Sequence, residues 1–189
     1  MRKIEQKINL YGKICKAEMM EFGEEDKEQW KKLWNTWMDL KLGLRSYEVR
    51  EPNLSEGLSE IAFCIYTGSK RLLNVTGGCN ASADSYHIER MEAEQIKATS
   101  IGKDLTSFGP KTKWDKLYFL DFYRNGELDG SFDCYEIDKE LIYSTVVNKG
   151  KNETFRDQQD QGRRPRLSLK KIIQDNNIQP CGVDIKVWL

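Results

Sequence analysis

The chain has 189 residues, which suits one domain with an adequate hydrophobic core and leaves little room for a second. Hydrophobic residues make up 39% and charged residues 32%, as in soluble globular proteins. No apolar run approaches the ~18 residues of a membrane-spanning helix, and the charged residues 1–5 lack an apolar signal region. We therefore expect a cytoplasmic protein with no membrane partner.

Charge and cysteine content exclude several classes of site. Thirty basic residues balance thirty acidic ones, so no overall positive field indicates a nucleic-acid partner, although residues 163–171 are locally basic and residues 18–28 locally acidic. The five cysteines include no Cys-x-x-Cys pair, which argues against a zinc site or a disulfide framework and favours mostly reduced core thiols. The single histidine, His87, excludes sites with several histidine ligands, and a structural or surface role is favoured for it.

The first part of the chain is predicted to be helical. Residues 1–22 place apolar side chains at loose helical spacing, and residues 24–42 form a second amphipathic helix with an acidic first turn and Gly43 as C-cap. The apolar stripe of this second helix carries three tryptophans: Trp30, Trp34 and Trp37. Burial in the core is the favoured interpretation and a dimer surface the alternative. Residues 1–50 are thus an expected helical N-terminal part.

A further helix is predicted over residues 54–67. Asn53 can cap it, Glu56 can complete a capping box, and Gly68 can end it. Glu56 and Glu60 are four residues apart and share one face of this helix.

A polar hairpin follows. Residues 85–88 and 93–101 predict two strands joined by a polar turn. Because side chains alternate along a strand, Gln95 and Lys97 share one face, beside Asp84. Carboxylate and amide oxygens next to a fixed cation are what metal-assisted hydrolysis of a phosphodiester requires.

The remaining elements complete a sheet of at least four strands. An aromatic-rich strand is followed by an Asn-Gly turn and a returning strand, and a short helix and an edge strand or docked tail end the chain. The predicted ranges are 117–123, 131–137, 168–176 and 183–189.

The spacing of Asp84 and Gln95-Ile96-Lys97 resembles the active site of the PD-(D/E)XK nuclease superfamily, with Gln where Glu is commoner. Residues 104–115 and 155–166 are similar to small type II restriction endonucleases, especially those that cut interrupted sites of the form GCNGC. The resemblance covers about residues 53–180.

This resemblance implies a restriction-endonuclease-like α+β fold, with a central mixed β-sheet flanked by helices. Residues 1–189 would form one such domain, with the catalytic core in residues 53–147 and a DNA-contacting part in residues 148–189. The implied activity is Mg²⁺-dependent hydrolysis of double-stranded DNA.

The resemblance also implies roles for individual residues. Asp84, Gln95 and the Ile96 carbonyl would ligate Mg²⁺, and Lys97 would orient or deprotonate the attacking water. A glutamate from the preceding helix approaches the metal in many such enzymes, and we assign this role to Glu60, for which a solvated helix face is an equally weighted alternative. Capping alone is favoured for Glu56. Gln in place of Glu removes a negative charge, so the DNA phosphate or Glu60 must contribute to metal binding.

Candidates for DNA contact come from the two segments that carry the resemblance. Arginine suits phosphate and guanine, and glutamine suits adenine, although a polar loop that is merely solvated is the alternative. The candidates are Ser107, Lys111, Lys113, Arg156, Gln158, Gln161, Arg163, Arg164 and Arg166.

We therefore predict a type II restriction endonuclease, and expect a homodimer because a two-fold symmetric DNA site needs one active site per strand. One alternative is a non-catalytic DNA-binding module that has kept a nuclease-like sheet. Another is a structural protein that binds partners through the tryptophan helix.

Overall fold

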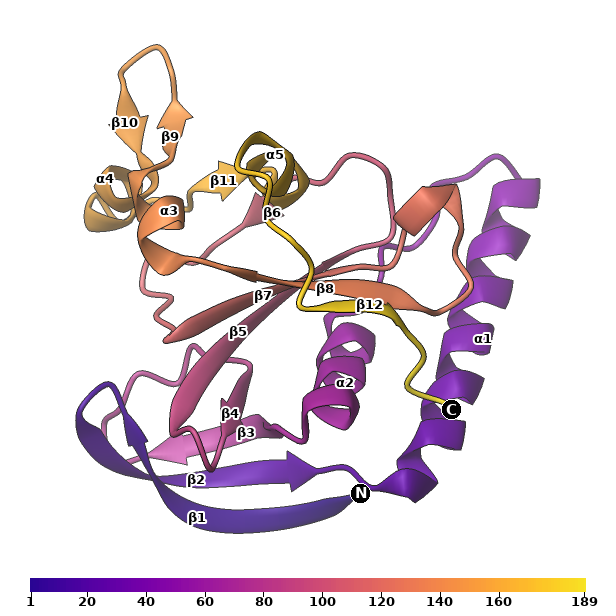
Figure 1. Ribbon diagram of the computed structural model, residues 1–189, viewed down its shortest axis with the longest axis horizontal. Coiled ribbons are helices and arrows are strands. Elements are labelled where there is room, and N and C mark those ends of the chain that lie inside the picture. Colours follow the sequence, from indigo (N-terminus) through magenta and orange to yellow (C-terminus); the bar gives the residue numbers. More distant parts are fainter.

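A computed structural model describes residues 1–189 as a large sheet with helices on both faces (Figure 1). The eight strands of the sheet lie in the order β1-β2-β3-β4-β5-β7-β8-β12. Only β5 and β7 pair in parallel; the other neighbours are antiparallel. The predicted α+β fold, with a central mixed sheet flanked by helices, is confirmed.

The sheet strands are β1 (Arg2–Leu10), β2 (Lys13–Glu21), β3 (Lys70–Thr76), β4 (Ser85–His87), β5 (Glu92–Thr99), β7 (Lys116–Asp121), β8 (Phe132–Ile137) and β12 (Gly182–Ile185). The helices are α1 (Glu24–Ser46), α2 (Glu56–Thr67), α3 (Lys139–Ser144), α4 (Phe155–Asp160) and α5 (Leu169–Asp175), with a 3-10 turn, η1, at Arg124–Gly126. Two small ribbons pair β6 (Thr106–Ser107) with β11 (Arg166–Leu167) and β9 (Val146–Asn148) with β10 (Glu153–Thr154).

Residues 1–22 form the β1–β2 hairpin, so the predicted helix there was wrong. The hairpin turns at Tyr11 and Gly12, whose φ angles of 54° and 84° are the two positive values that a type I′ turn requires. Along β2 the buried residues alternate with exposed ones, at Cys15, Ala17 and Met19. This period of two is the pattern of a half-buried strand, and only α1 of the N-terminal part is helical.

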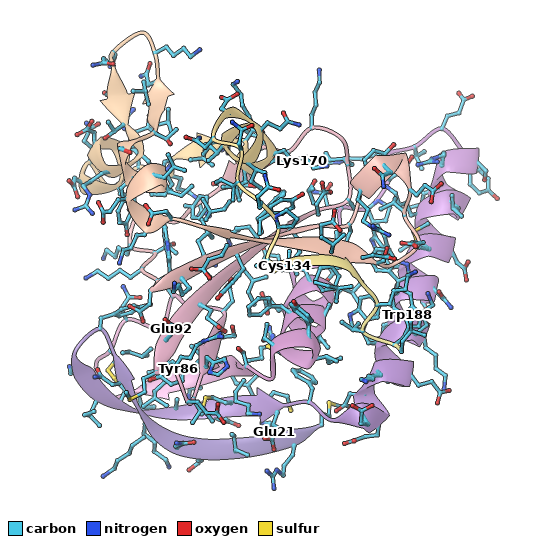
Figure 2. All side chains as sticks on the ribbon, viewed as in Figure 1. Glu21, Tyr86, Glu92, Cys134, Lys170 and Trp188 are labelled. Atoms are coloured by element: carbon cyan, nitrogen blue, oxygen red, sulfur yellow. A yellow bond between two sulfur atoms is a disulfide. The ribbon has the colours of Figure 1, made fainter.

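The tryptophans of α1 lie in the core, as predicted. Trp30 and Trp34 are 1% exposed and Trp37 is 8% exposed. Trp188 from the C-terminal tail stacks on Trp30 with ring centroids 5.8 Å apart, which fixes the tail beside α1 (Figure 2). Gly43 does not end the helix.

The end of α1 lies beyond Gly43 because contacts hold its last turn. Ser46 Oγ donates to the Gly43 carbonyl at 2.7 Å, and Arg45 Nε pairs with Glu51 at 2.6 Å. An interior glycine costs roughly 1 kcal/mol relative to alanine, and these contacts offset it.

The α2 helix begins two residues later than predicted. Ser55 is its N-cap residue and makes no side-chain capping bond, so the Asn53–Glu56 capping box was wrong. The Asn53 carbonyl instead accepts the Trp37 indole N–H at 3.1 Å. Gly68 ends the helix as predicted, with φ 76° and its N–H donating to the Cys64 carbonyl at 2.9 Å.

Alternate residues of the central strands fill two cores on opposite sheet faces. Tyr118 and Leu120 of β7 join the cluster that contains α1 and α2, while Leu117 and Phe119 join the cluster of α3, α4 and α5. The sheet therefore separates two helical layers, and β5 passes between them.

The later predictions were mostly confirmed. β7, β8 and α5 lie within or close to their predicted ranges, and β12 pairs with β8 at the sheet edge. Residues 148–166 are more ordered than expected, because they contain α4 and half of the β9–β10 ribbon. This ribbon projects from the body in Figure 1. None of the helices combines the length and apolar character that crossing a bilayer requires.

Two cysteines depart from the expected reduced state. A disulfide joins Cys15 of β2 to Cys79 in the loop before β4, with Cα atoms 6.4 Å apart. The pairing depends on β2 lying next to β3, which brings together residues 64 positions apart and leaves no local sequence signal. Cys64 and Cys134 are buried free thiols, and Cys181 is an exposed one.

Candidate active site

The two strands of the predicted polar hairpin, β4 and β5, separate after Ser85↔Glu94, and we call this point the fork. β4 pairs with β5 only from His87↔Glu92 to Ser85↔Glu94, whereas β5 and β7 stay paired up to Thr99↔Asp121. Beyond Glu94, β5 thus has a neighbour on one edge only (Figure 1). Its other edge presents backbone groups that no strand satisfies.

Asp84 lies at the base of this fork, and its carboxylate hydrogen-bonds to the backbone at the unpaired edge of β5. Its N–H donates to the Glu94 carbonyl at 2.9 Å, and its Oδ2 accepts the Ile96 N–H at 2.7 Å. The Gln95 side-chain amide also donates to the same oxygen. The carboxylate of Asp84 therefore takes the place of a neighbouring strand.

The direction of the Ile96 carbonyl follows from this arrangement. Backbone groups of successive strand residues point to alternate edges, and the N–H and C=O of one residue point to the same edge. The Thr99 carbonyl accepts the Phe122 N–H, so odd-numbered residues of β5 face β7. The Ile96 carbonyl consequently faces the open edge, alongside Asp84.

Gln95 contributes an oxygen with no partner. Its side chain is 2% exposed, and Oε1 is buried without a hydrogen bond. An unsatisfied buried acceptor costs about 1–3 kcal/mol, so such an atom in a native fold indicates a missing donor or cation.

Lys97 lies in a cleft of about 360 Å³. Its Nζ is 5.6 Å from the centroid of the Phe108 ring, and it makes no ion pair. Glu56 and Ser59 of α2 line one wall, and Arg164 lies in the lining of the same cleft. The cleft thus contains an uncommitted cation beside the fork.

Burial raises the pKa of Asp84 to about 6. The Lys97 charge and the Ile96 N–H oppose this rise, whereas the Glu60 and Glu56 charges add to it. All four groups therefore act on the Asp84 carboxylate, although they come from two different elements.

Glu60, assigned above to metal support, is committed to an ion pair. Arg71 Nε donates to its Oε2 at 2.6 Å, and the Glu60 side chain is 11% exposed. Burial raises the pKa of Glu60, and Arg71 opposes the rise. Glu56, for which capping alone was favoured, lines the cleft instead, and no local pattern predicted the role of Arg71.

The oxygen atoms at the fork suit a hard cation. Asp84, the orphaned Gln95 Oε1 and the Ile96 carbonyl are all oxygen donors, which Mg²⁺ prefers. The chain offers no cluster of three or more His, Cys, Asp or Glu side chains arranged for a metal. The fork thus fits a magnesium ion with a single formal negative charge, and further ligands must come from water or substrate.

The predicted DNA contacts fall into separate groups. Ser107 and Arg164 line the cleft, and the Ser107 hydroxyl is buried without a partner. Lys111, Lys113 and Arg156 line a second hollow.

The remaining candidates lie outside both cavities. Gln161 and Arg166 are exposed and Gln158 is half-buried. Arg163 pairs with Glu153 at 2.5 Å, so its guanidinium is already occupied.

Asp104 is a structural residue of the site that the sequence did not single out. Its carboxylate accepts the Leu169 N–H at 2.7 Å and the Ser168 hydroxyl at 2.6 Å. It thereby ties the cleft wall at β6 to the start of α5. The only signal was its place in a turn-rich segment.

Comparisons with known proteins find a family model and a relative of this chain. The family model of the Bsp6I restriction endonuclease matches residues 22–176, a range that contains the fork and the cleft. The type II restriction enzyme Bsp6I of Bacillus sp. (strain RFL6) is 35% identical over 155 residues, covering 80% of this chain and 83% of that enzyme. No solved structure matches the chain.

Proposed function

The chain belongs to the Bsp6I restriction endonuclease family, and from this premise we propose that the fork at Asp84 is where it cuts DNA. The protein is a type II restriction endonuclease, a hydrolase of double-stranded DNA in a restriction-modification system. The observation that carries the assignment is the open edge of β5, where Asp84, the orphaned Gln95 oxygen and the free Lys97 meet.

Mg²⁺ is the proposed cofactor, held by Asp84, Gln95 and the Ile96 carbonyl. When bound, it supplies Lewis-acid stabilisation of the charge that develops on the scissile phosphate. Because Gln95 is neutral, these residues bring one negative charge, and we expect weak metal binding until the DNA phosphate adds its own charge.

Lys97 is the proposed cationic catalyst. Its ammonium has no ion-pair partner and lies within the cleft, so it is free to donate to a phosphate oxygen and to hold the attacking water. Attack on phosphorus breaks the P–O bond to the leaving sugar oxygen, and a fixed cation stabilises the added negative charge of that transition state.

Glu60 and Glu56 are proposed to support the site in different ways. The Glu60 carboxylate is held in place by Arg71, and its charge acts on Asp84, whereas Glu56 lines the cleft. Glu60→Gln and Glu56→Gln separate the two: an activity loss with Glu60→Gln supports our assignment, and a loss with Glu56→Gln alone transfers the role to Glu56.

Unpaired cations support DNA contact by the second half of the chain. Most acids of that half are bonded internally; for example, Asp104 and Asp157 cap helices and Glu153 pairs with Arg163. Many of its basic residues are left without an ion pair: Lys97, Lys103, Lys111, Lys113, Lys139, Lys149, Lys151, Arg156, Arg164 and Arg166. A neutral chain thus acquires a cationic surface that phosphates can occupy.

Ser107 and Arg164, in the cleft, are proposed to contact DNA next to the cut. Gln158, Gln161 and Arg166 are proposed to contact DNA beyond it. Arg163 can contact DNA only if its ion pair with Glu153 breaks.

Recognition of GCNGC, a homodimer and a cytoplasmic location complete the proposal. A two-fold symmetric site is cut on both strands by two copies of one active site. Gel filtration of the protein with and without DNA tests the dimer, and a monomer in both cases would contradict it.

Digestion of long duplex DNA tests the proposed activity. With Mg²⁺ we expect discrete fragments whose ends map to GCNGC, and with EDTA we expect intact DNA. A smear would contradict site specificity, and intact DNA across several divalent metals would favour a non-catalytic DNA-binding module.

A further inference from the structure

A second hollow, of about 380 Å³, lies on the other side of the loop that walls the cleft. Residues 104–107 line the cleft, and residues 110–113 of the same loop line this hollow. The β1–β2 turn contributes Tyr11, and α3 and α4 contribute Lys139 and Arg156. Three parts of the chain that are distant in sequence thus meet around one cavity.

The lining of the hollow is strongly cationic. It contains Lys111, Lys113, Lys139 and Arg156, and its acidic residue is Asp160. None of the four cations makes an ion pair, although many other basic residues of the chain do. Four like charges around one cavity repel one another, and an anion would relieve this repulsion.

The hollow is built rather than incidental. The Arg156 guanidinium lies 4.3 Å from the centroid of the Tyr143 ring, which orients it. The Tyr11 hydroxyl donates to the Lys113 carbonyl at 2.6 Å, and the Gln159 amide donates to the Gly109 carbonyl at 2.9 Å. These bonds tie the β1–β2 turn and α4 to the shared loop.

The hollow is also linked to the catalytic fork. The Lys113 N–H donates to Ser82 Oγ at 2.8 Å, and the Asn80 side chain donates to the Lys111 carbonyl at 2.9 Å. Residues 80–82 lead directly to Asp84. A ligand held in the hollow therefore touches the loop that positions the segment before the metal-binding carboxylate.

We propose that this hollow binds a phosphodiester of the DNA backbone away from the cleaved bond, clamping the duplex while the fork cuts it. The proposal rests on the proposed function for its duplex substrate. A planar guanidinium and several ammonium groups are the side chains that bind backbone phosphates without reading sequence. The clamp should therefore add affinity for any duplex, and should not change the chemistry at the fork.

The test compares the double variant Lys139→Gln/Arg156→Gln with the matched control Lys7→Gln/Arg50→Gln. The control removes an exposed lysine and an exposed arginine that also lack ion pairs but lie outside the hollow. Binding of specific and unrelated duplexes is measured in EDTA over a range of salt concentrations. The cleavage rate at saturating DNA is then measured with Mg²⁺.

We expect the double variant to bind both duplexes more weakly, and the slope of log K against log salt to fall in magnitude by about 0.9 for the lost phosphate. The control should keep the wild-type slope, and both variants should keep the cleavage rate at saturating DNA. An unchanged slope in the double variant, or a loss confined to the cleavage rate, would overturn the inference.

Two further outcomes separate this inference from neighbouring claims. If the wild type does not cut DNA but the double variant still shows the expected smaller salt slope relative to the wild type, the clamp is supported and only the proposed activity is contradicted. Inorganic phosphate that raises the thermal stability of the wild type but not of the double variant, with an unchanged DNA slope, would indicate a free-anion site and contradict the clamp.

Discussion

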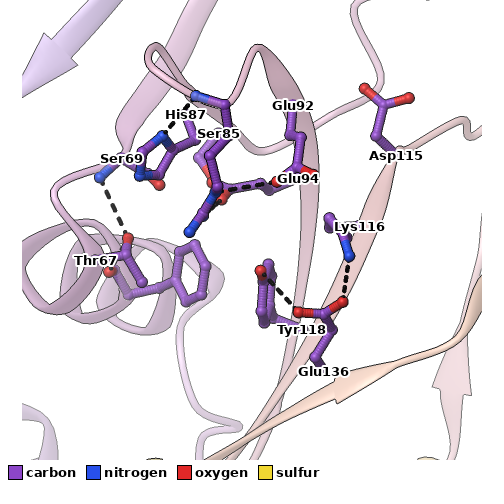
Figure 3. A network of polar contacts seen from close by, with 12 residues as sticks. Thr67, Ser69, Ser85, His87, Glu92, Glu94, Asp115, Lys116, Tyr118 and Glu136 are labelled. Carbon is purple, nitrogen blue, oxygen red and sulfur yellow. Dashed lines mark hydrogen bonds and ion pairs between the residues drawn. The ribbon is translucent and has the colours of Figure 1, made fainter. Parts of the chain in front are cut away.

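Two carboxylates, the half-buried Asp84 and the buried Glu94, lie at the β4–β5 hairpin in opposite surroundings. The Asp84 N–H bonds the Glu94 carbonyl, so the two residues are neighbours across the hairpin. Glu94 is enclosed in partners: Ser85 Oγ donates to it at 2.6 Å and Arg90 at 3.0 Å (Figure 3). Asp84 lies beside an orphaned amide oxygen and an unpaired lysine.

One end of the hairpin therefore serves the stability of the fold, and the other is proposed to serve the reaction. Hydrogen bonds and ion pairs around Glu94 stabilise the hairpin, and His87 adds to them because its Nδ1 accepts the Arg90 N–H at 3.3 Å. At the open end of the hairpin, bonding capacity is left for a ligand and its substrate. Gln95 Oε1 and Ser107 Oγ, two of the buried polar atoms without a partner, lie at the proposed site and its cleft, whereas Ser69 Oγ and Trp114 Nε1 lie elsewhere. An unsatisfied atom therefore supports the proposed site only together with the free charge of Lys97.

The largest expected effect is on activity at the open end. Asp84→Ala should slow cleavage by ~10³-fold or more, because it removes the charged ligand of the proposed metal site. The matched control, Asp175→Ala, removes an exposed carboxylate paired with Lys171 and should cut normally. Wild-type cleavage by Asp84→Ala would place the chemistry elsewhere.

A change at the paired end of the hairpin, around Glu94, should lower the stability of the protein. Glu94→Ala leaves the buried Ser85 hydroxyl without its acceptor and leaves Arg90 with Glu92 as its remaining partner, so the free energy of unfolding in urea should fall by about 3 kcal/mol. Asp175→Ala, which breaks the exposed pair with Lys171, should cost at most about 1 kcal/mol. Equal costs would remove the distinction between the two ends of the hairpin.

The pH dependence of stability should show the cost of removing the charged Asp84 carboxylate from water. Burial raises its pKa from about 3.9 to about 6, so the metal-free folded state binds a proton more tightly than the unfolded state. The contribution of Asp84 to stability should therefore fall as pH rises from about 4 to 6, by roughly 2–3 kcal/mol, against the opposite contribution of carboxylates such as Glu51, whose pKa ion pairs lower. Asp84→Asn should lack this loss and be more stable than wild type at pH 7 in EDTA; a less stable variant would contradict it.

Gln95→Glu should give the smallest effect. A second carboxylate at the fork should tighten Mg²⁺ binding in the absence of DNA by on the order of tenfold, since charge count sets the affinity of such sites. Isothermal titration calorimetry measures this, with Gln159→Glu as a control outside the fork. An unchanged affinity would argue against Gln95 as a ligand.

The sequence predicted what depends on local pattern. The strand character of the hairpin, the spacing of Asp84 and Lys97 and the apolar stripe of α1 are visible in short windows. Gly12 and the alternation along β2 also indicate the β1–β2 hairpin, but the helix prediction rested on the loose helical spacing of larger apolar residues alone.

The rest depends on contacts between distant segments. The Glu60–Arg71 pair, the Cys15–Cys79 disulfide and the cationic hollow all join residues from different elements. These contacts depend on how the elements pack together, which a short stretch of sequence does not show. The neutral net charge concealed the cationic surface for the same reason, because which acids are bonded internally is decided by the fold.

The most direct test of the central claim is single-turnover cleavage by Lys97→Ala, with DNA binding measured in parallel. Lys103→Ala is the matched control, because Lys103 is an exposed lysine without an ion pair a few residues beyond β5. We expect Lys97→Ala to fold and to bind duplex DNA yet to cut at least ~10³-fold more slowly, while Lys103→Ala cuts at the wild-type rate when DNA is saturating. A Lys97→Ala protein that cuts as fast as the wild type would contradict this expectation.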